Sequence, residues 1–188
     1  MQSFVDNTQN FRRTDGAWAK RWFHPVPLES LRETTSNDIP AAGSDANGGL
    51  LAKDTTPNLE FTNGDTDSAI RLDWAASNAD PVTFSVPLPP HLDTSKDLTI
   101  YVLAAMAGAT DIPVLDFDTF FGKGDTKVSD ASAAVTGTSV AVYPVTIAAS
   151  DIPKAWVDYF TMSVEITPAA HTTDVLYVYG ISVLGFVL

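Results

Sequence analysis

Several residue types that carry common enzyme chemistry are absent from this 188-residue chain or scarce in it. There is no cysteine, which excludes thiol catalysis, thiolate zinc sites and disulfide bonds. The three histidines stand far apart and show no metal-binding spacing, and the sequence contains no GxSxG, P-loop or GxGxxG motif. We therefore expect no catalytic residue, no cofactor and no enzymatic activity.

His171 has the most suggestive neighbours of the three histidines, because Asp174 follows it and could orient its ring. The alternative is a hairpin connection in which the Asp and Thr side chains bind the amides of the turn. We favour the hairpin connection.

Basic residues are also few, since 11 Lys and Arg stand against 23 Asp and Glu, giving a net charge of −12. Phosphate backbones and anionic membranes would repel such a chain, so we expect neither nucleic acid nor membrane as a partner. The N-terminus has no basic segment followed by an apolar run, which predicts no export signal. The longest apolar stretch, residues 175–188, is interrupted by glycine and serine and is shorter than the roughly 20 residues of a spanning helix.

Glutamate is scarce as well, and most of the acidic residues are aspartate, which favours turns over helix interiors. From residue 70 onward, apolar and polar residues alternate in short runs separated by turns, most clearly over residues 160–166. This pattern predicts an all-β fold, an antiparallel jelly-roll-like β-sandwich. Trp74 and Trp156 are expected in its core, and one short helical turn is expected at residues 150–156.

The first third of the chain differs from the rest in charge and pattern. Residues 1–33 have a net charge of +1, and residues 34–69 are rich in Thr, Ser, Asn, Asp, Gly and Pro without a sustained period. We therefore predict an extended, largely irregular N-terminal arm and loop region over residues 1–69, followed by the sandwich domain over residues 70–188.

Aromatic and basic residues gather within the predicted arm. Such residues dominate binding energy at protein interfaces. The candidate contact residues are Arg12, Arg13, Trp18, Arg21, Trp22 and Phe23. The alternative is that these aromatic side chains fold back on their own sandwich.

The last strand of the chain is apolar on both faces. We expect Val175, Tyr177, Tyr179, Ile181 and Val183 on one face, and Leu176, Val178 and Leu184 on the other. Such a strand is either central in its sheet or covered on its outer face by another subunit, and both can hold. The candidate oligomer-interface residues are Tyr177, Tyr179, Phe186 and Leu188.

Two groups of aspartates offer oxygen ligands to a calcium ion, but we favour the alternative that they are solvated turn aspartates. The weak candidates are Asp65 and Asp67 in one loop, and Asp116 and Asp118 beside the Phe120–Phe121 pair. The first loop does not follow the EF-hand pattern, because Ser68 stands at its sixth position and Trp74 at its twelfth. We expect no bound metal.

Two stretches resemble the strand-loop-strand pattern of jelly-roll virion proteins: residues 80–93 leading to 98–102, and residues 162–168 leading through 171–174 to 176–180. Both are similar to small structural proteins of tailed bacteriophages, particularly head decoration (cement) proteins. The resemblance implies a homotrimer that binds the major capsid protein on the capsid exterior and stabilises the head. It also implies a location in the virion, and in the host cytoplasm during assembly.

An alternative function is a carbohydrate- or receptor-binding jelly-roll module of a tail fibre or head fibre. Modules of that kind expose aromatic side chains across a sheet face or on loops. The candidates for this role are Tyr101, Phe120, Phe121 and Tyr143.

Overall fold

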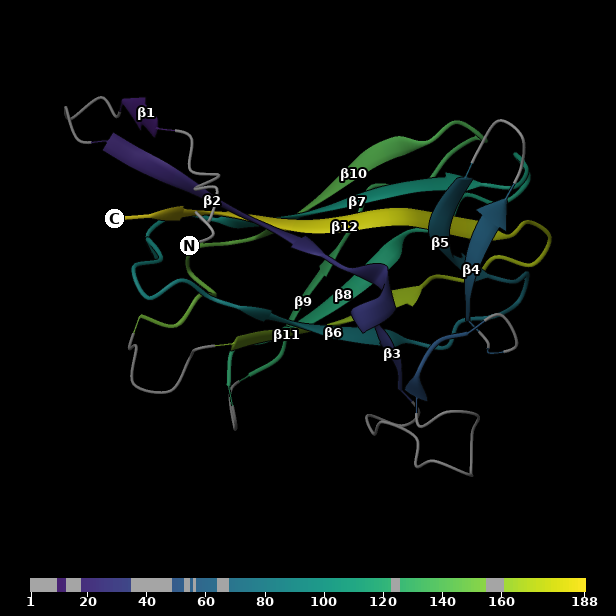
Figure 1. Cartoon of the computed structure of the whole chain (residues 1–188), viewed down its shortest axis with the longest axis horizontal. Helices are drawn as coiled ribbons and strands as arrows, with labels where there is room; N and C mark the ends of the chain where they lie inside the picture. Colours follow the sequence, from purple (N-terminus) through teal and green to yellow (C-terminus); the bar gives the residue numbers. More distant parts are fainter. Residues whose placement is uncertain are drawn as a thin grey trace, which may run out of the picture.

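The computed structural model describes residues 10–12, 18–34, 49–52, 55, 57–63, 68–122, 126–154 and 161–188, which form two antiparallel sheets in a sandwich (Figure 1). The seven-stranded sheet contains β1 (Asn10–Arg12), β2 (Trp18–Val26), β4 (Asn58–Asn63), β5 (Ser68–Trp74), β7 (Leu98–Met106), β10 (Ala141–Ile147) and β12 (Leu176–Val187). The five-stranded sheet contains β3 (Arg32–Glu33), β6 (Val82–Pro87), β8 (Leu115–Phe120), β9 (Val128–Ala131) and β11 (Thr161–Pro168). The predicted all-β sandwich is confirmed.

The structure contains a 3₁₀ turn, η1 (Leu28–Ser30), and no α-helix among the described residues. A helical turn was expected at residues 150–156, but residues 150–154 form a turn without helix. In this turn the Asp151 amide donates to the Ala148 carbonyl at 2.9 Å. Residues 155 and 156, and with them Trp156, lie outside the described part. No helix within the described part has the length and hydropathy needed to cross a bilayer.

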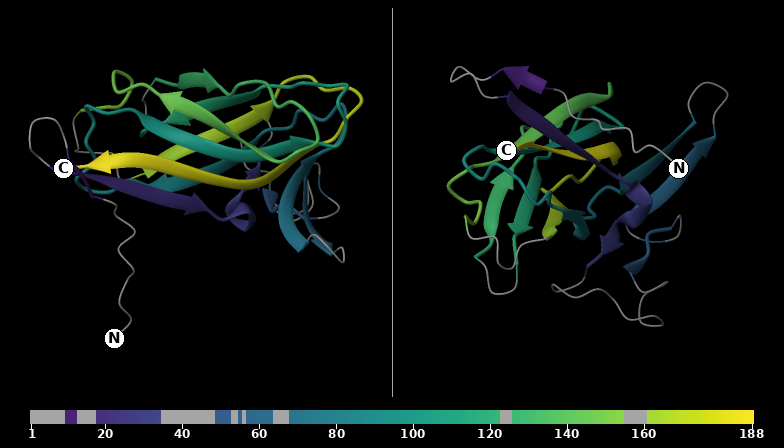
Figure 2. Two further views of the ribbon diagram at one scale, coloured as in Figure 1. Left: turned by 90° about the horizontal axis from the view of Figure 1, so that it is seen from above. Right: turned by 60° about the vertical axis from the view of Figure 1, so that its left-hand side comes forward.

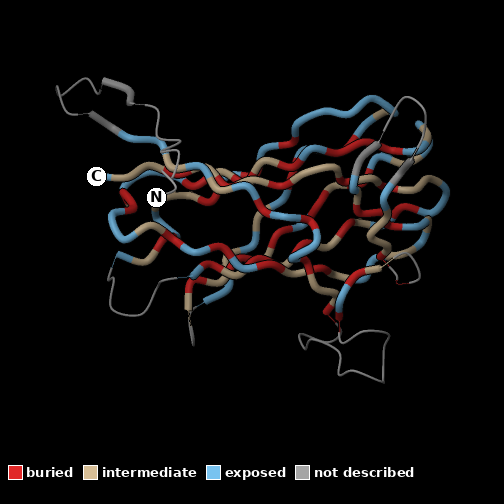
Figure 3. The backbone as a smooth tube through the Cα atoms, viewed as in Figure 1, coloured by how far each residue is buried: buried red, intermediate tan, exposed pale blue. Residues whose placement is uncertain are grey.

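The core lies between the two sheets and follows from the alternation of the strands (Figure 3). In β6 and β11 every second side chain is buried, because successive residues of a strand point to opposite faces. Trp74 is fully buried as predicted, and its indole N–H donates to the Asp80 carbonyl at 2.8 Å. This bond satisfies the one polar group that Trp74 takes into the core.

The terminal strand β12 is central in the seven-stranded sheet. One of its edges pairs with β7 along most of its length, and the other pairs first with β5 and then with β2. Figure 2 shows β2 running beside the C-terminal half of β12. Central placement, one of the two explanations for its apolar character, is therefore confirmed.

The side-chain faces expected for β12 are wrong beyond Tyr179. The pairing of β12 with β7 shifts register between Val178 and Gly180, so an extra residue interrupts the alternation. The core side of β12 consists of Leu176, Val178, Ile181, Val183 and Gly185, and the outer side of Tyr177, Tyr179, Ser182, Leu184 and Phe186. Ile181 and Val183 thus lie on the face opposite to Tyr177 and Tyr179.

The described strands of the N-terminal region belong to the sandwich, where an arm was expected. β2 pairs with β12, β3 pairs with β6, and β4 forms a hairpin with β5, so the expected boundary at residue 69 falls inside β5. The physical reason is a period-two pattern within β2 that places Trp22 and Val26 against the core.

Candidate functional site

A groove with a volume of about 650 Å³ lies on the outer face of the five-stranded sheet. Strands β6, β8 and β11 form its floor, with Thr34 beyond the end of β3 and Lys127 just before β9 at its sides. The alternation that buries the apolar residues of β6 and β11 turns their hydroxyl and carboxyl residues toward this groove.

The groove residues form two rows that cross neighbouring strands. In the first row Ser163 lies between Ser85 and Phe120, and in the second Glu165 lies between Thr83 and Asp118. The rows are two residues apart along each strand, which corresponds to roughly 7 Å. The Oγ atoms of Ser85 and Ser163 are hydrogen-bonded at 3.1 Å.

Glu165 is held at the side of the groove by a buried hydroxyl. Thr34 Oγ1 donates a hydrogen bond to Glu165 Oε2 at 3.1 Å, and Thr34 is itself buried. The carboxylate is thereby oriented as a hydrogen-bond acceptor on the groove surface.

Lys127 is anchored by an ion pair at the opposite side. Its Nζ lies 2.8 Å from Asp118 Oδ2, while Ser129 Oγ donates to Asp118 Oδ1 at 2.7 Å. Burial alone would raise the pKa of Asp118, but these two bonds lower it below the ordinary value. The hydrogen bond to Asp118 raises the pKa of Lys127, which stays a cation.

Two of the calcium candidates, Asp116 and Asp118, lie within the described residues, and neither has neighbours typical of a calcium site. Asp118 binds an ammonium and a hydroxyl, and Asp116 is exposed on the same strand. No group of three or more metal-binding side chains occurs in the described ranges. Asp65 and Asp67 lie outside those ranges.

Of the four aromatic candidates, Phe120 is the one that borders the groove, where it is half-buried. Phe121 is buried in the core, and Tyr143 is buried with its hydroxyl accepting from the Thr136 amide at 3.2 Å. Tyr101 is half-buried on the outer face of the other sheet.

The predicted contact cluster divides between the two faces of β2. Arg21 and Phe23 point outward, whereas Trp22 packs against the core and stacks on His24 with ring centroids 5.8 Å apart. Burial lowers the pKa of His24. Of Arg12 and Trp18 the structure describes the strand positions alone, and Arg13 lies outside the described residues.

The predicted oligomer-interface residues of β12 lie on its outer face or at its end. Tyr177 and Tyr179 meet edge to face at 6.3 Å, and the Arg71 guanidinium lies 4.1 Å from the Tyr177 ring centroid. Phe186 is half-buried, and Leu188 at the end of the chain is exposed.

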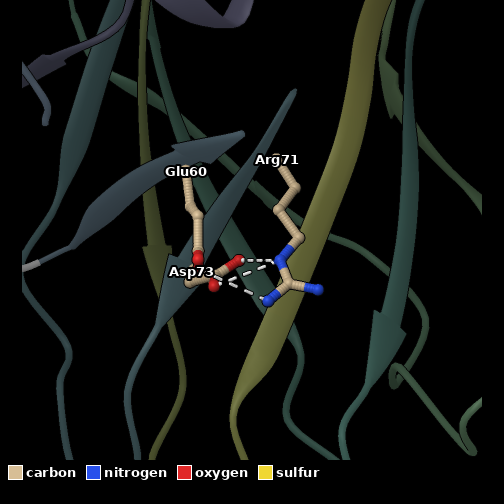
Figure 4. A network of polar contacts seen from close by, with 3 residues as sticks. All are labelled: Glu60, Arg71 and Asp73. Carbon is tan, nitrogen blue, oxygen red and sulfur yellow. Dashed lines mark hydrogen bonds and ion pairs between the residues drawn. The ribbon is translucent and has the colours of Figure 1, made fainter. Parts of the chain in front are cut away.

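Arg71 belongs to an ion-pair network that sequence reasoning missed (Figure 4). Its Nε lies 2.9 Å from Asp73 Oδ1, and its Nη2 lies 3.5 Å from Glu60 Oε2. Burial raises the pKa of Asp73 to about 6 and outweighs the opposing effect of Arg71. The alternation of Leu72 and Trp74 with Arg71 and Asp73 was the available signal, but hairpin partners such as Glu60 cannot be read from one strand.

The surroundings of His171 fit a structural role in a connection, but the expected hairpin is wrong, because β11 and β12 belong to different sheets and the connection crosses between them. His171 is buried, and its ring nitrogens lie 3.1 Å from the Ala169 carbonyl and 3.4 Å from the Trp74 carbonyl. The Asp174 carboxylate instead accepts from the Thr110 and Asp111 amides, while Asp111 accepts from the Thr173 and Asp174 amides. These reciprocal bonds join the loop after β7 to the loop before β12 and lower the pKa of Asp111.

Comparison with known proteins gives a fold and no family. No protein-family model and no curated protein sequence matches the chain. Among solved structures, the xylan-binding module CBM15 matches with a TM-score of 0.51 and 10% identity, over 88% of this chain and 97% of that one. A family 29 carbohydrate-binding module from Piromyces equi matches with a TM-score of 0.41, 7% identity and coverage of 87% and 90%. The tailspike protein 4 enzymatic domain of bacteriophage CBA120 matches with a TM-score of 0.38, 11% identity and coverage of 86% and 19%.

The first of these matches supports the jelly-roll fold that the sequence predicted. Identities this low carry no information on ligands, so the function has to be argued from the groove.

Proposed function

We propose that this protein is a non-catalytic carbohydrate-binding jelly roll whose groove on the five-stranded sheet holds a segment of a glycan. One observation carries the proposal: hydroxyls, a carboxylate, an ammonium and an aromatic ring line a single groove of about 650 Å³. A sugar has hydroxyls that donate and accept hydrogen bonds, and C–H faces that pack on aromatic rings. The groove offers partners for both, within the volume range of small-ligand sites.

Each lining residue has a role in this proposal. The ring of Phe120 supplies the apolar contact, and Glu165 accepts hydrogen bonds from sugar hydroxyls. Ser163 lies beside Phe120 on the neighbouring strand, Ser85 lies on the far side of Ser163, and both hydroxyls can donate or accept. Lys127 donates from the side of the groove.

Binding measurements with two groove variants and a matched control test the proposal. The full chain is screened on an array of plant, bacterial and fungal glycans, and the best ligand is titrated by calorimetry. Phe120→Ala and Glu165→Gln should each weaken binding about tenfold, which corresponds to about 1.4 kcal/mol.

The control is Phe23→Ala, which removes a half-exposed phenyl ring from the outer face of the other sheet and should leave affinity unchanged. Absence of binding across the array, or an equal loss in Phe23→Ala, would overturn the proposal.

The virion setting is a separate proposal that rests on the resemblance to phage structural proteins. A tail-fibre or head-fibre module is the virion role that a glycan groove fits best, whereas a decoration role requires binding to the major capsid protein. Mixing the protein with capsids that lack it, followed by sedimentation, separates these roles, because only a decoration protein should pellet with the capsids.

A further inference from the structure

Acidic residues are absent from four adjacent strands of the seven-stranded sheet. Strands β2, β7, β10 and β12 contain none of the 23 Asp and Glu residues of the chain, and their charged residues are Lys20 and Arg21 at the start of β2. Each strand of the five-stranded sheet except β6 carries at least one acid. The acidic residues of that sheet are Glu33, Asp116, Asp118, Asp130 and Glu165.

The outer side of these four strands carries exposed apolar residues and no acids; we call it the acid-free face. Val142, Phe23 and Leu103 are exposed there to 56%, 45% and 37%. The strand pairing sets Phe23 directly opposite Leu184, and Leu103 directly opposite Val142. Cross-strand neighbours are about 5 Å apart. Tyr101, two residues before Leu103 on the outer side of β7, lies between the two pairs.

Charge decides what can cover this face. A net charge of −12 repels nucleic acids and other polyanions, and it also repels a second copy of the chain over most of the surface. On the acid-free face that repulsion is least, and the apolar area removed from water stabilises the contact. We propose that a second copy of this chain docks on the acid-free face, sheet against sheet.

The charged groups at the ends of the face fit a two-fold arrangement. Arg21 lies opposite Phe186 near the end of β12, and Asp73, in the network with Glu60, lies opposite Tyr177 near its start. These positions are nine residues apart, which corresponds to about 30 Å of strand. β2 and β5 share one edge of β12, so a two-fold axis across the strands sets Arg21 of one copy against the network of Asp73, Arg71 and Glu60 of the other, in which two carboxylates stand against one guanidinium.

The docked pair leaves the proposed glycan groove open, because the groove lies on the other sheet. The pair also covers Tyr177, Tyr179 and Phe186, which the sequence marked as interface candidates. A two-fold contact gives a dimer, in place of the homotrimer that the phage resemblance implied.

Sedimentation equilibrium of the full chain over a range of concentrations tests the proposal. The mass should rise to twice the chain mass of 20.1 kDa. Leu103→Glu and Val142→Glu each place a charge on the acid-free face and should raise the dimer dissociation constant at least tenfold. The control is Ile112→Glu, which makes the same kind of change at a residue exposed to 60% outside the four strands, and should leave the constant unchanged.

Circular dichroism and thermal melting confirm that each variant is folded before its mass is measured. The proposal is overturned by a wild-type monomer at all concentrations, by a mass of three chains, or by folded variants that dimerise like the wild type. If Leu103→Glu abolished glycan binding and Phe120→Ala did not, the acid-free face would be the glycan site, and that result would also overturn the dimer proposal.

Discussion

Asp73 is a carboxylate that points outward from its sheet and is nevertheless buried. Its side chain is 9% exposed, because Arg71 and Tyr177 pack over it on the same face. Arg71 donates from Nε to Asp73 Oδ2 at 3.2 Å, yet the pKa of Asp73 is raised to about 6. Removal of the carboxylate from water therefore costs more than this single ion pair returns.

This imbalance predicts a pH dependence. The folded-state pKa lies above the unfolded value of 3.8, so the folded chain binds more protons between these values, and stability falls as pH rises through about 6. We expect the wild type to gain stability relative to Asp73→Asn, by on the order of 2 kcal/mol, between pH 7 and pH 4. Urea unfolding of both proteins at pH 7 and pH 4 measures the difference between their free energies of unfolding. If that difference were the same at both pH values, burial of the Asp73 carboxylate would not destabilise the fold.

At the scale of elements, β12 combines a central position with two glycines in different surroundings. A Cβ atom on Gly185 would lie 2.7 Å from Leu98 Cδ2, 3.1 Å from Leu92 Cδ1 and 3.3 Å from the Trp22 ring. A Cβ on Gly180, at the register shift, would have Leu103 Cβ as its nearest neighbour at 3.9 Å. Because Gly185 has no side chain, the Trp22 ring can pack against the core beside β12.

We therefore expect Gly185→Ala to lower the free energy of unfolding by about 1–3 kcal/mol, because the added methyl group overpacks the core beside Trp22. Gly180→Ala, on the same strand, should change it by less than about 1 kcal/mol. Chemical denaturation of both variants provides the comparison. Equal effects of the two substitutions would show that the core yields to the extra methyl group at Gly185.

At the scale of the whole molecule, charge is distributed by sheet. The strands of the five-stranded sheet carry five acids, whereas the acid-free face carries none. The net charge of −12 remains after every lysine and arginine, including Lys127 in its pair with Asp118, has been counted, so the folded chain repels itself.

Salt should therefore stabilise the fold. Raising the NaCl concentration from 10 to 500 mM shortens the Debye length from about 30 Å to below 10 Å and screens this repulsion. We expect the melting temperature at pH 7 to rise by several degrees, with a smaller rise near the isoelectric point of 4.3, where net charge is small. A lower melting temperature in salt would mean that ion pairs outweigh the repulsion.

Alternation and composition suffice to predict the all-β sandwich and the buried Trp74, because both follow from the local period of two. The same pattern in residues 162–166 puts Ser163 and Glu165 on the side opposite to the core residues, although it does not reveal that they line a groove. Gly180 is of a residue type common at β-bulges, but a glycine alone does not establish the register shift after Val178, which moved Ile181 and Val183 to the core side.

The sequence by itself determined the class of fold, the high net negative charge and the separation of acids from certain strands, since these depend on residue type and local spacing. Only the tertiary structure decided which strands lie side by side. Pairing brought β2 from the expected arm to β12, set Phe120 beside Ser163 in one groove, and joined Glu60 to Arg71 and Asp73. These contacts link residues far apart along the chain, and pairing of that kind is fixed by packing of the whole sandwich and not by any local signal.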